Sequence, residues 1–204
     1  MTEDSDALVV LGDSVPAGNA TDAAPWPDSV VETDGPLAAT DSPLAGAPVV
    51  VRGDTGTTLA SLADDADAHL DAALAELRAA DPSLAVLVHA GHNDAQLSGG
   101  DPRVSETEFR HAATLLDRAL ADHPAVVRHG FVGLVPLLPD HRVPFADAQP
   151  ARSLTYDDAL ADSVATHVPV ARPVGDWHDR TVDGVHPDGE GHAVVAAAVG
   201  DLLT

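Results

Sequence analysis

The sequence predicts an α/β fold, a three-layer α/β/α sandwich built on a five-stranded, parallel, doubly wound sheet. Short apolar runs alternate with longer amphipathic segments along the 204 residues, and this alternation is typical of βαβ units. The runs are apolar throughout, which indicates strands that helices cover on both faces. No internal repeat and no compositional break divides the chain, so we expect residues 1–204 to form one domain.

Five apolar runs are expected to form the strands. The first run, Ala-Leu-Val-Val-Leu, ends at Gly12. The second and third runs end in the same way, at Gly53 and Gly91, where the chain can turn sharply. Right-handed crossovers then place successive strands in one parallel sheet. In chain order, strands are expected over residues 7–11, 47–52, 84–90, 125–134 and 168–172.

Five further segments are expected to form helices. The strongest covers residues 59–80, where leucines and alanines recur along one stripe until Asp81 and Pro82 stop the helix. A second stripe, which includes Phe109, predicts a helix over residues 106–122. In chain order, helices are expected over residues 26–32, 59–80, 106–122, 154–166 and 189–203.

Charge and composition exclude several classes of function. The chain has 33 acidic and ten basic residues and a net charge of −23, so it lacks the basic face that a nucleic-acid-binding protein needs. The same charge disfavours an anionic membrane surface, and no apolar run reaches the roughly 18 residues of a membrane span. Cysteine is absent, which excludes thiol catalysis, thiolate metal sites and disulfides.

The composition also indicates adaptation to salt. All ten basic residues are arginine and aspartate far outnumbers glutamate, a composition that resembles that of proteins from halophilic archaea. At about 1 M salt the Debye length is about 3 Å, so the mutual repulsion of the acidic groups is largely screened. The first six residues are acidic and polar, without the basic region of a secretion signal, so we expect a cytoplasmic location.

Polar residues follow the strands at the edge where doubly wound sheets place their sites. After the first strand comes Gly12-Asp13-Ser14, whose serine is either a helix cap or a nucleophile at a helix N-terminus. After the third strand comes Gly-His-Asn-Asp, residues 91–94. This loop after the third strand is either an ordinary polar turn or the source of an amide N–H that stabilises an oxyanion.

The loop after the second strand is open to three interpretations. Residues 53–58, Gly-Asp-Thr-Gly-Thr-Thr, fit a turn with a threonine helix cap, a loop that cradles a phosphate, or the Asp-Thr-Gly signature of an aspartic protease. The protease interpretation needs a second such aspartate, and the chain has one Asp-Thr-Gly. A flavin- or nucleotide-binding module is also disfavoured, because its phosphate loop normally follows the first strand.

The segment before the last helix contains Asp183 and His186, three residues apart. If the backbone turns there, the histidine can act as a general base that the aspartate orients. The alternative is an Asp-Gly turn with a surface histidine. The pairs His89 with His92 and His178 with His186 lack the ligand spacing of known metal sites, so we expect no metal.

Taken together, in this order and after these strands, the four loops resemble the blocks of the SGNH/GDSL hydrolase family. The resemblance implies the flavodoxin-like SGNH fold and, without a cofactor, ester hydrolysis through an acyl-serine intermediate. It implies that Ser14 is the nucleophile, His186 its base and Asp183 the residue that orients the base. It also implies an oxyanion hole made by the backbone N–H groups of Ser14 and Gly56 and the side chain of Asn93.

The resemblance covers residues 8–197, with three departures from the family pattern. Val15 stands where leucine is frequent, Arg52 where an asparagine often precedes the second-block glycine, and His92 at a variable position. Arg52 leaves the shape of the second-block loop open. None of the three departures removes a catalytic group.

The substrate that the resemblance implies is a small or medium ester, carboxylic or acetyl. Asp13, His92, Trp26 and Phe145 are the candidates for contact with it, and for His92 the alternative is a position that supports the site or is exposed. Thioesterases, lysophospholipases, carbohydrate deacetylases and acyltransferases belong to the same family, so these activities stay open. A non-catalytic ligand-binding module on the same fold is the alternative from a different class.

Overall fold

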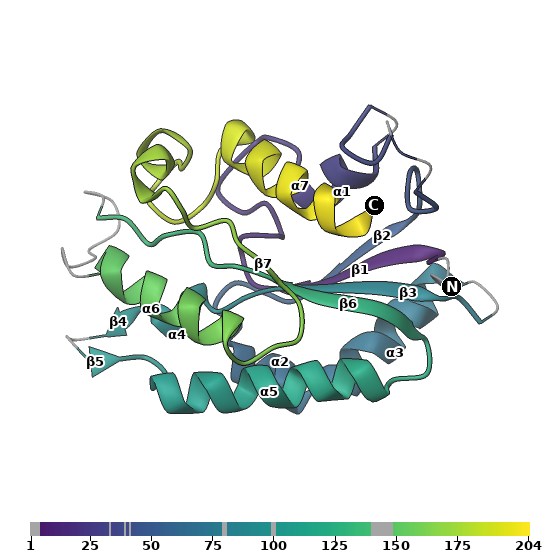
Figure 1. Ribbon diagram of the computed structural model, residues 1–204, viewed down its shortest axis with the longest axis horizontal. Helices are drawn as coiled ribbons and strands as arrows, with labels where there is room; N and C mark the ends of the chain where they lie inside the picture. Colours follow the sequence, from purple (N-terminus) through teal and green to yellow (C-terminus); the bar gives the residue numbers. More distant parts are fainter. Residues whose placement is uncertain are drawn as a thin grey trace.

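Five parallel strands form the central layer of the protein, and helices cover both faces of the sheet (Figure 1). The computed structural model describes residues 5–32, 34–38, 40, 42–78, 81–98, 101–139 and 149–204. The strands are β1 (Ala7–Gly12), β2 (Val49–Arg52), β3 (Leu84–His89), β6 (Val126–Val132) and β7 (His167–Val168), and their order in the sheet is β2-β1-β3-β6-β7. The predicted doubly wound α/β sandwich is therefore confirmed.

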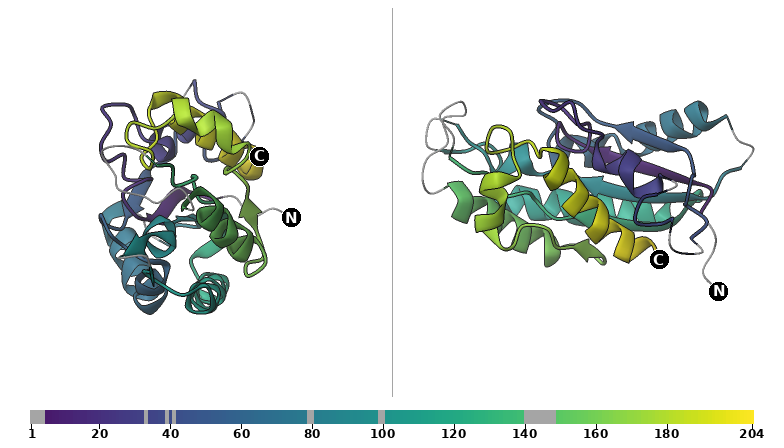
Figure 2. Two further views of the ribbon diagram at one scale, coloured as in Figure 1. Left: turned by 90° about the vertical axis from the view of Figure 1, so that its left-hand side faces the viewer. Right: turned by 90° about the horizontal axis from the view of Figure 1, so that it is seen from above.

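Helices pack on the two faces of this sheet as separate layers (Figure 1, Figure 2). One face carries α1 (Trp26–Val31) and α7 (Gly189–Leu203). The opposite face carries α2 (Leu59–Asp64), α3 (Ala66–Leu77), α5 (Glu106–Asp122) and α6 (Gln149–Ala161). Among the helices that the structure describes, none combines the length and the apolar character needed to cross a membrane.

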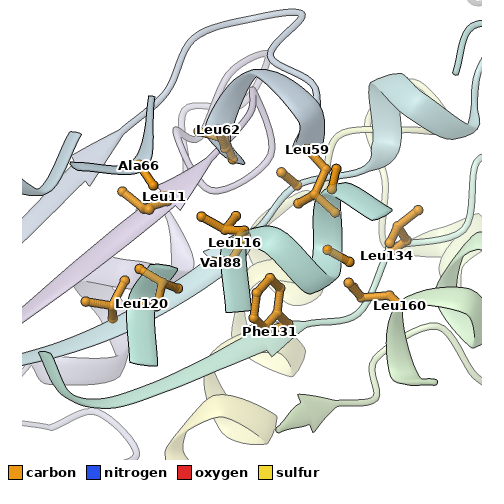
Figure 3. Packing of buried hydrophobic residues seen from close by; sticks show 14 of the residues in the cluster. Leu11, Leu59, Leu62, Ala66, Val88, Leu116, Leu120, Phe131, Leu134 and Leu160 are labelled. Carbon is orange, nitrogen blue, oxygen red and sulfur yellow. The ribbon is translucent and has the colours of Figure 1, made fainter. Parts of the chain in front are cut away.

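Successive residues of each strand point to opposite layers, so both faces of the sheet are buried. In β1, Leu8 and Val10 pack with α1 and α7, whereas Val9 and Leu11 pack with the helices of the other face. Figure 3 shows that second cluster, in which strand residues such as Phe131 meet leucines of α2 and α5. Full burial of one such side chain stabilises the fold by about 1.5–3 kcal/mol.

The helix predicted over residues 59–80 is in fact two helices, α2 and α3, which meet at Asp65. The backbone of Asp65 has φ −114° and ψ 18°, outside the helical region, so α2 ends and α3 begins there. Thr58 and Ser61 form a capping box at the start of α2. α3 ends before Arg78, whose φ of 52° is left-handed. The apolar stripe continues across the break, so the pattern alone predicts one helix.

Prolines explain why two strands are shorter than predicted. The strand predicted over residues 47–52 begins at Val49, because Pro48 has no N–H to donate to a neighbouring strand. The strand predicted over residues 168–172 is β7, which stops before Pro169 for the same reason.

α6 begins and ends earlier than the helix predicted over residues 154–166. It ends at Ala161 because the chain has to become extended before β7. The carbonyl of Thr166 accepts the N–H of Phe131 at 2.9 Å, and a helix continuing through Thr166 would remove this bond to the sheet. The remaining predicted strands and helices agree with the structure to within two residues at each end.

Four elements have too few residues for a periodic pattern, and the sequence does not predict them. They are α4 (His92–Ala95), the antiparallel pair β4 (Leu97–Ser98) and β5 (Asp101–Pro102), and the 3₁₀ helix η1 (Val174–Asp179). α4 and the β4–β5 pair follow β3 directly, so they lie beyond the carboxyl end of the sheet (Figure 1).

Gly53 directly follows β2 at a point where two backbones approach closely. Its φ is +135°, and a β-carbon here would lie 1.6 Å from the carbonyl oxygen of Gly12. We expect Gly53→Ala to lower the free energy of unfolding by at least about 3 kcal/mol, because backbone strain and a backbone clash add. Thermal unfolding followed by circular dichroism measures this loss.

Gly46→Ala is the matched control for this prediction. Gly46 also has a positive φ, +75°, but a β-carbon there would meet nothing within 4 Å. We expect this variant to lose only about 1 kcal/mol, from backbone strain alone. Equal losses in the two variants would contradict the importance of the close approach between the two strand ends.

Candidate active site

The predicted site residues come from loops at the carboxyl ends of neighbouring strands. β2, β1 and β3 are adjacent in the sheet, so the loops that follow them share one edge. Ser14 lies in the turn after β1, Gly56 lies between β2 and α2, and Asn93 lies in α4 after β3. Asp183 and His186 come from the segment between η1 and α7.

Hydrogen bonds join three of these side chains in a row. His186 Nε2 lies 2.9 Å from Ser14 Oγ, and His186 Nδ1 lies 2.8 Å from Asp183 Oδ2. An ionised carboxylate can only accept, so Nδ1 carries the proton and donates it to Asp183. The lone pair of Nε2 then faces the Ser14 hydroxyl, which is the arrangement of a serine nucleophile with its general base.

The backbone around Asp183 folds so that its carboxylate is held from two sides. Oδ1 accepts the backbone N–H groups of Val185 at 3.0 Å and of His186 at 2.9 Å, which leaves Oδ2 for the imidazole. Partial burial raises the pKa of Asp183, but the hydrogen bonds from His186 and Val185 together lower it below its usual range. Asp183 is therefore ionised at neutral pH and can stabilise a positive charge on His186.

A buried chain of hydrogen bonds connects the turn that carries Ser14 to the core of the protein. Asp13 Oδ1 accepts the N–H of Val15 at 2.9 Å, and Asp13 Oδ2 lies 2.9 Å from His92 Nδ1. The N–H of Val135 donates to His92 Nε2 at 3.0 Å. A backbone N–H can only donate, so Nε2 is the acceptor and the proton of His92 sits on Nδ1, facing Asp13.

Three of the four residues predicted to contact the substrate are instead buried. The exposed fractions are 0% for Asp13, 1% for His92 and 0% for Trp26, so the structure contradicts substrate contact by these side chains. For His92, the alternative of a supporting position agrees with the structure. The polar groups of Asp13 and His92 form the hydrogen bonds that support the Ser14 turn. Trp26 packs in the core between the sheet and α7. Trp177, the other tryptophan, is also in that core. Phe145 lies outside the described residues.

Three N–H groups at this edge fit the predicted oxyanion hole. Asn93 Nδ2 donates one proton to the carbonyl of Thr57 at 2.9 Å and keeps a second proton to donate. Within the described residues, the backbone N–H groups of Ser14 and Gly56 have no protein acceptor. Gly56 has a φ of +88°, which a residue with a β-carbon rarely adopts. The donors that the sequence predicts are therefore available to a ligand.

Two further residues, Asp94 and Arg103, support the groups of the predicted oxyanion hole, and the sequence did not predict either of them. Both carboxylate oxygens of Asp94 accept the N–H of Leu59, at 3.2 and 3.0 Å, and so attach the start of α2 to α4. Burial raises the pKa of Asp94 to about 6. The guanidinium of Arg103 donates to the side chain of Asn93 and to the carbonyl of Gly56. Asp94 is the neighbour of a predicted site residue, whereas no motif contains Arg103.

Residues 53–58 form a turn that leads into α2. The N–H of Asp54 donates to Thr57 Oγ1 at 2.9 Å, and the N–H of Thr57 donates to the carbonyl of Asp54 at 3.0 Å. Thr58 then caps the helix. Of the three interpretations of this loop, the turn with a threonine cap agrees with the structure.

His89 lies beneath the site, in the core. Its Nδ1 accepts the indole N–H of Trp26 at 3.0 Å, and its ring packs edge-on at 5.1 Å from the ring of His92. Burial lowers the pKa of His89 to about 3, so the ring is neutral at physiological pH. Across the ranges that the structure describes, no three His, Asp or Glu side chains converge as ligands for a metal ion.

The lowered pKa of His89 predicts how stability depends on pH. The folded protein protonates His89 only near pH 3, whereas the unfolded chain does so near pH 6.5, so the unfolded state binds more protons between these values. The free energy of unfolding therefore falls as the pH decreases from 6.5 toward 3, by on the order of 4 kcal/mol from this group.

Urea unfolding across this pH range measures the effect in wild type and in His89→Asn. The asparagine oxygen can still accept the Trp26 N–H, but the side chain does not titrate. We expect a distinctly shallower loss of stability on acidification in the variant. Parallel pH profiles for the two proteins would show that His89 does not cause the dependence.

Comparisons with known proteins identify the family and agree with the fold. A model of the GDSL-like lipase/acylhydrolase family matches residues 10–194. A catalytic mutant of an acetylxylan esterase from Geobacillus stearothermophilus is similar in structure, with a TM-score of 0.70 and 17% identity over 100% of this chain and 96% of that chain. An alpha/beta hydrolase enzyme from the metagenome of Lake Arreo, Spain, has a TM-score of 0.68 and 19% identity over 100% and 99% of the two chains. No curated protein sequence matches.

Proposed function

The chain belongs to the GDSL-like lipase/acylhydrolase family, and from this we propose that it hydrolyses small soluble esters through an acyl-Ser14 intermediate. One observation carries the proposal. The side chains of Ser14, His186 and Asp183 lie in one row, with 2.9 Å between Ser14 Oγ and His186 and 2.8 Å between His186 and Asp183, and this supports the roles of nucleophile, base and orienting carboxylate.

The reaction follows from this row in two halves. Ser14 Oγ attacks the ester carbonyl carbon while its proton passes to His186 Nε2, and Asp183 stabilises the imidazolium. The N–H groups of Ser14, Gly56 and Asn93 stabilise the oxyanion, at about 3 kcal/mol for each donor. The ester C–O bond then breaks and the proton on Nε2 goes to the departing alcohol. In the second half, His186 Nε2 takes a proton from a water molecule whose oxygen attacks the acyl carbonyl carbon. The C–O bond to Ser14 then breaks, the carboxylic acid leaves, and the proton on Nε2 returns to Ser14 Oγ.

The surface supports a short acyl group rather than a long lipid chain. Among the described residues, Leu115 is the one large apolar side chain that is exposed, and it lies on α5. Close to the proposed oxyanion hole lie the polar side chains of Asn19 and Thr55, and Asn19 Nδ2 donates to Thr55 Oγ1 at 2.7 Å. Such groups suit an alcohol that carries hydroxyls. The similar structure of an acetylxylan esterase is consistent with this choice.

The acidic composition supports the further proposal that the enzyme works in concentrated salt. A net charge of −23 on 204 residues repels itself at low ionic strength, and molar salt screens that repulsion. The cytoplasm of a cell that accumulates salt provides such conditions, and we propose it as the location of the enzyme.

Hydrolysis of 4-nitrophenyl esters tests these proposals together. We expect acetate and butyrate to be cleaved much faster than octanoate, and activity to be higher at about 3 M KCl than at about 0.2 M, with circular dichroism reporting the fold at each salt concentration. Faster turnover of octanoate or of a lysophospholipid would contradict the short acyl group. Full activity and stability at low salt would contradict the salt adaptation.

A further inference from the structure

Arg103 connects two parts of the proposed oxyanion hole, although none of the four motif loops contains it. It follows the β4–β5 pair, and its backbone N–H donates to the carbonyl of Gln96 at 2.9 Å. Its Nη1 donates to Asn93 Oδ1 at 3.2 Å, and its Nη2 donates to the carbonyl of Gly56 at 3.2 Å. One planar cation therefore holds the Asn93 amide and the Gly56 carbonyl at a fixed separation.

These contacts determine which way the Asn93 amide faces. A guanidinium can only donate, so the amide oxygen has to face Arg103. The carbonyl of Thr57 can only accept, so the amide nitrogen has to face Thr57, at 2.9 Å. Both neighbours require the same orientation, which leaves the second N–H of Asn93 for the oxyanion.

The charge of Arg103 adds a second effect. A cation at the amide oxygen withdraws electron density from the nitrogen, and hydrogen bonds in a chain polarise one another. The free N–H of Asn93 is then a better donor to the negative oxygen that develops in the transition state. An interaction that strengthens with that charge raises kcat rather than the affinity for the ester.

We propose that Arg103 is a positioning residue, which acts through Asn93 and Gly56 to complete the oxyanion hole. This inference rests on the proposed function, because it assigns Arg103 to the same acyl-transfer step. Arg103 itself stabilises no reacting atom. It fixes two groups that do.

Three variants test the proposal by steady-state kinetics on 4-nitrophenyl acetate. For Arg103→Met we expect kcat to fall by about 10- to 100-fold with KM changed less than about threefold, because a misoriented donor is lost from the transition state. Arg103→Lys keeps the charge but has one nitrogen for two acceptors, so we expect it to recover part of kcat. Arg110→Met is the control, because Arg110 lies on α5 and pairs with Glu106 and Asp162.

The Asn93 side-chain amide gives a readout that does not require turnover. In ¹⁵N–¹H spectra this NH₂ pair is assigned from its loss in Asn93→Ala. We expect Arg103→Met to shift the pair and to speed its exchange with solvent, and Arg110→Met to leave it unchanged. Hydrogen exchange of the backbone amides of α5 shows whether either variant disturbs the fold.

The outcomes separate the inference from the proposed function. If Arg103→Met matches Arg110→Met in kcat and in the Asn93 signal, the positioning role is overturned. A rise in KM at constant kcat overturns it as well, since Arg103 would then bind the substrate. If wild type cleaves no ester, the proposed function fails, and the Asn93 signal alone decides whether Arg103 orients the amide.

Discussion

A Ser14→Ala variant is expected to lose ester hydrolysis by about 10⁴- to 10⁶-fold in kcat while keeping its fold. The methyl group cannot attack the carbonyl carbon, and no acyl-enzyme can form. Among the residues that the structure describes, the hydroxyl of Ser14 has one side-chain partner, His186 Nε2, on a side chain that is 19% exposed and so partly accessible to water. We therefore expect the free energy of unfolding to change by less than about 1 kcal/mol.

Pre-steady-state kinetics and covalent labelling measure this loss. Wild type is expected to release a burst of 4-nitrophenol and to react with a fluorophosphonate at one serine, and the variant is expected to do neither. Ser29→Ala is the matched control, because the Ser29 hydroxyl donates to the carbonyl of Pro25 within its own helix, α1. Undiminished hydrolysis or labelling in the Ser14 variant would assign the nucleophile elsewhere and refute the acyl-Ser14 mechanism.

Asp183→Asn is expected to lower kcat by about 10⁴-fold, the loss typical of amidating the aspartate of a serine-protease triad. The reason lies in the two backbone N–H groups, of Val185 and His186, that donate to Oδ1. They require the amide oxygen of the new asparagine, so its NH₂ faces His186 Nδ1. The imidazole then has to carry its proton on Nε2, where it can no longer accept a proton from Ser14.

Steady-state kinetics at pH 7 to 9 for Asp183→Asn and Asp188→Asn test this prediction. Asp188 caps α7 by accepting the N–H of Gly191 at 2.9 Å, and asparagine is an equally good cap. We expect the control to keep at least about half of wild-type kcat and both variants to unfold like wild type. A loss below about tenfold in Asp183→Asn would mean that the tautomer of His186 does not depend on Asp183.

The sequence predicts the positions of the site residues well, because chemistry and topology both restrict them. Parallel strands bring their carboxyl ends to one edge, so residues 14, 56 and 93 have to lie near one another once the strands are identified. Asp183 and His186 are three residues apart, and a single turn brings their side chains together. The positions follow from these arguments, and the roles stay predictions that the two variants above test.

The loop after β2 contains two glycines, Gly53 and Gly56, and the sequence pattern alone does not show which of them offers its N–H to a ligand. Gly53 is required by close approach, since its α-carbon faces the carbonyl of Gly12. Gly56 is required by a positive φ, and the space around it is open except for Arg103 at 3.9 Å. A close approach and a positive φ each require glycine. The residue type alone therefore does not distinguish a glycine needed for packing from one that offers its N–H to a ligand.

Residue type alone does not predict which of the candidate site residues are buried. Trp26 is an aromatic residue and His92 belongs to a motif loop, so both are candidates for substrate contact. In the fold each polar atom finds a buried partner: the indole N–H meets His89, and the imidazole meets Asp13 and Val135. Arg103 illustrates the opposite case, because a short hairpin with no periodic signal brings it to Asn93, ten residues earlier in the chain.

The hydrogen-bond chain from Val15 through Asp13 and His92 to Val135 has a consequence for how this enzyme can be modified. The turn that carries Ser14 is attached to core residues through Asp13 and His92, so changes of these two buried side chains disturb the fold as well as the site. The proposed oxyanion hole is instead contacted by Arg103, an exposed residue that follows the β4–β5 pair. Natural selection or directed evolution can therefore change the rate through substitutions at Arg103 without moving Ser14.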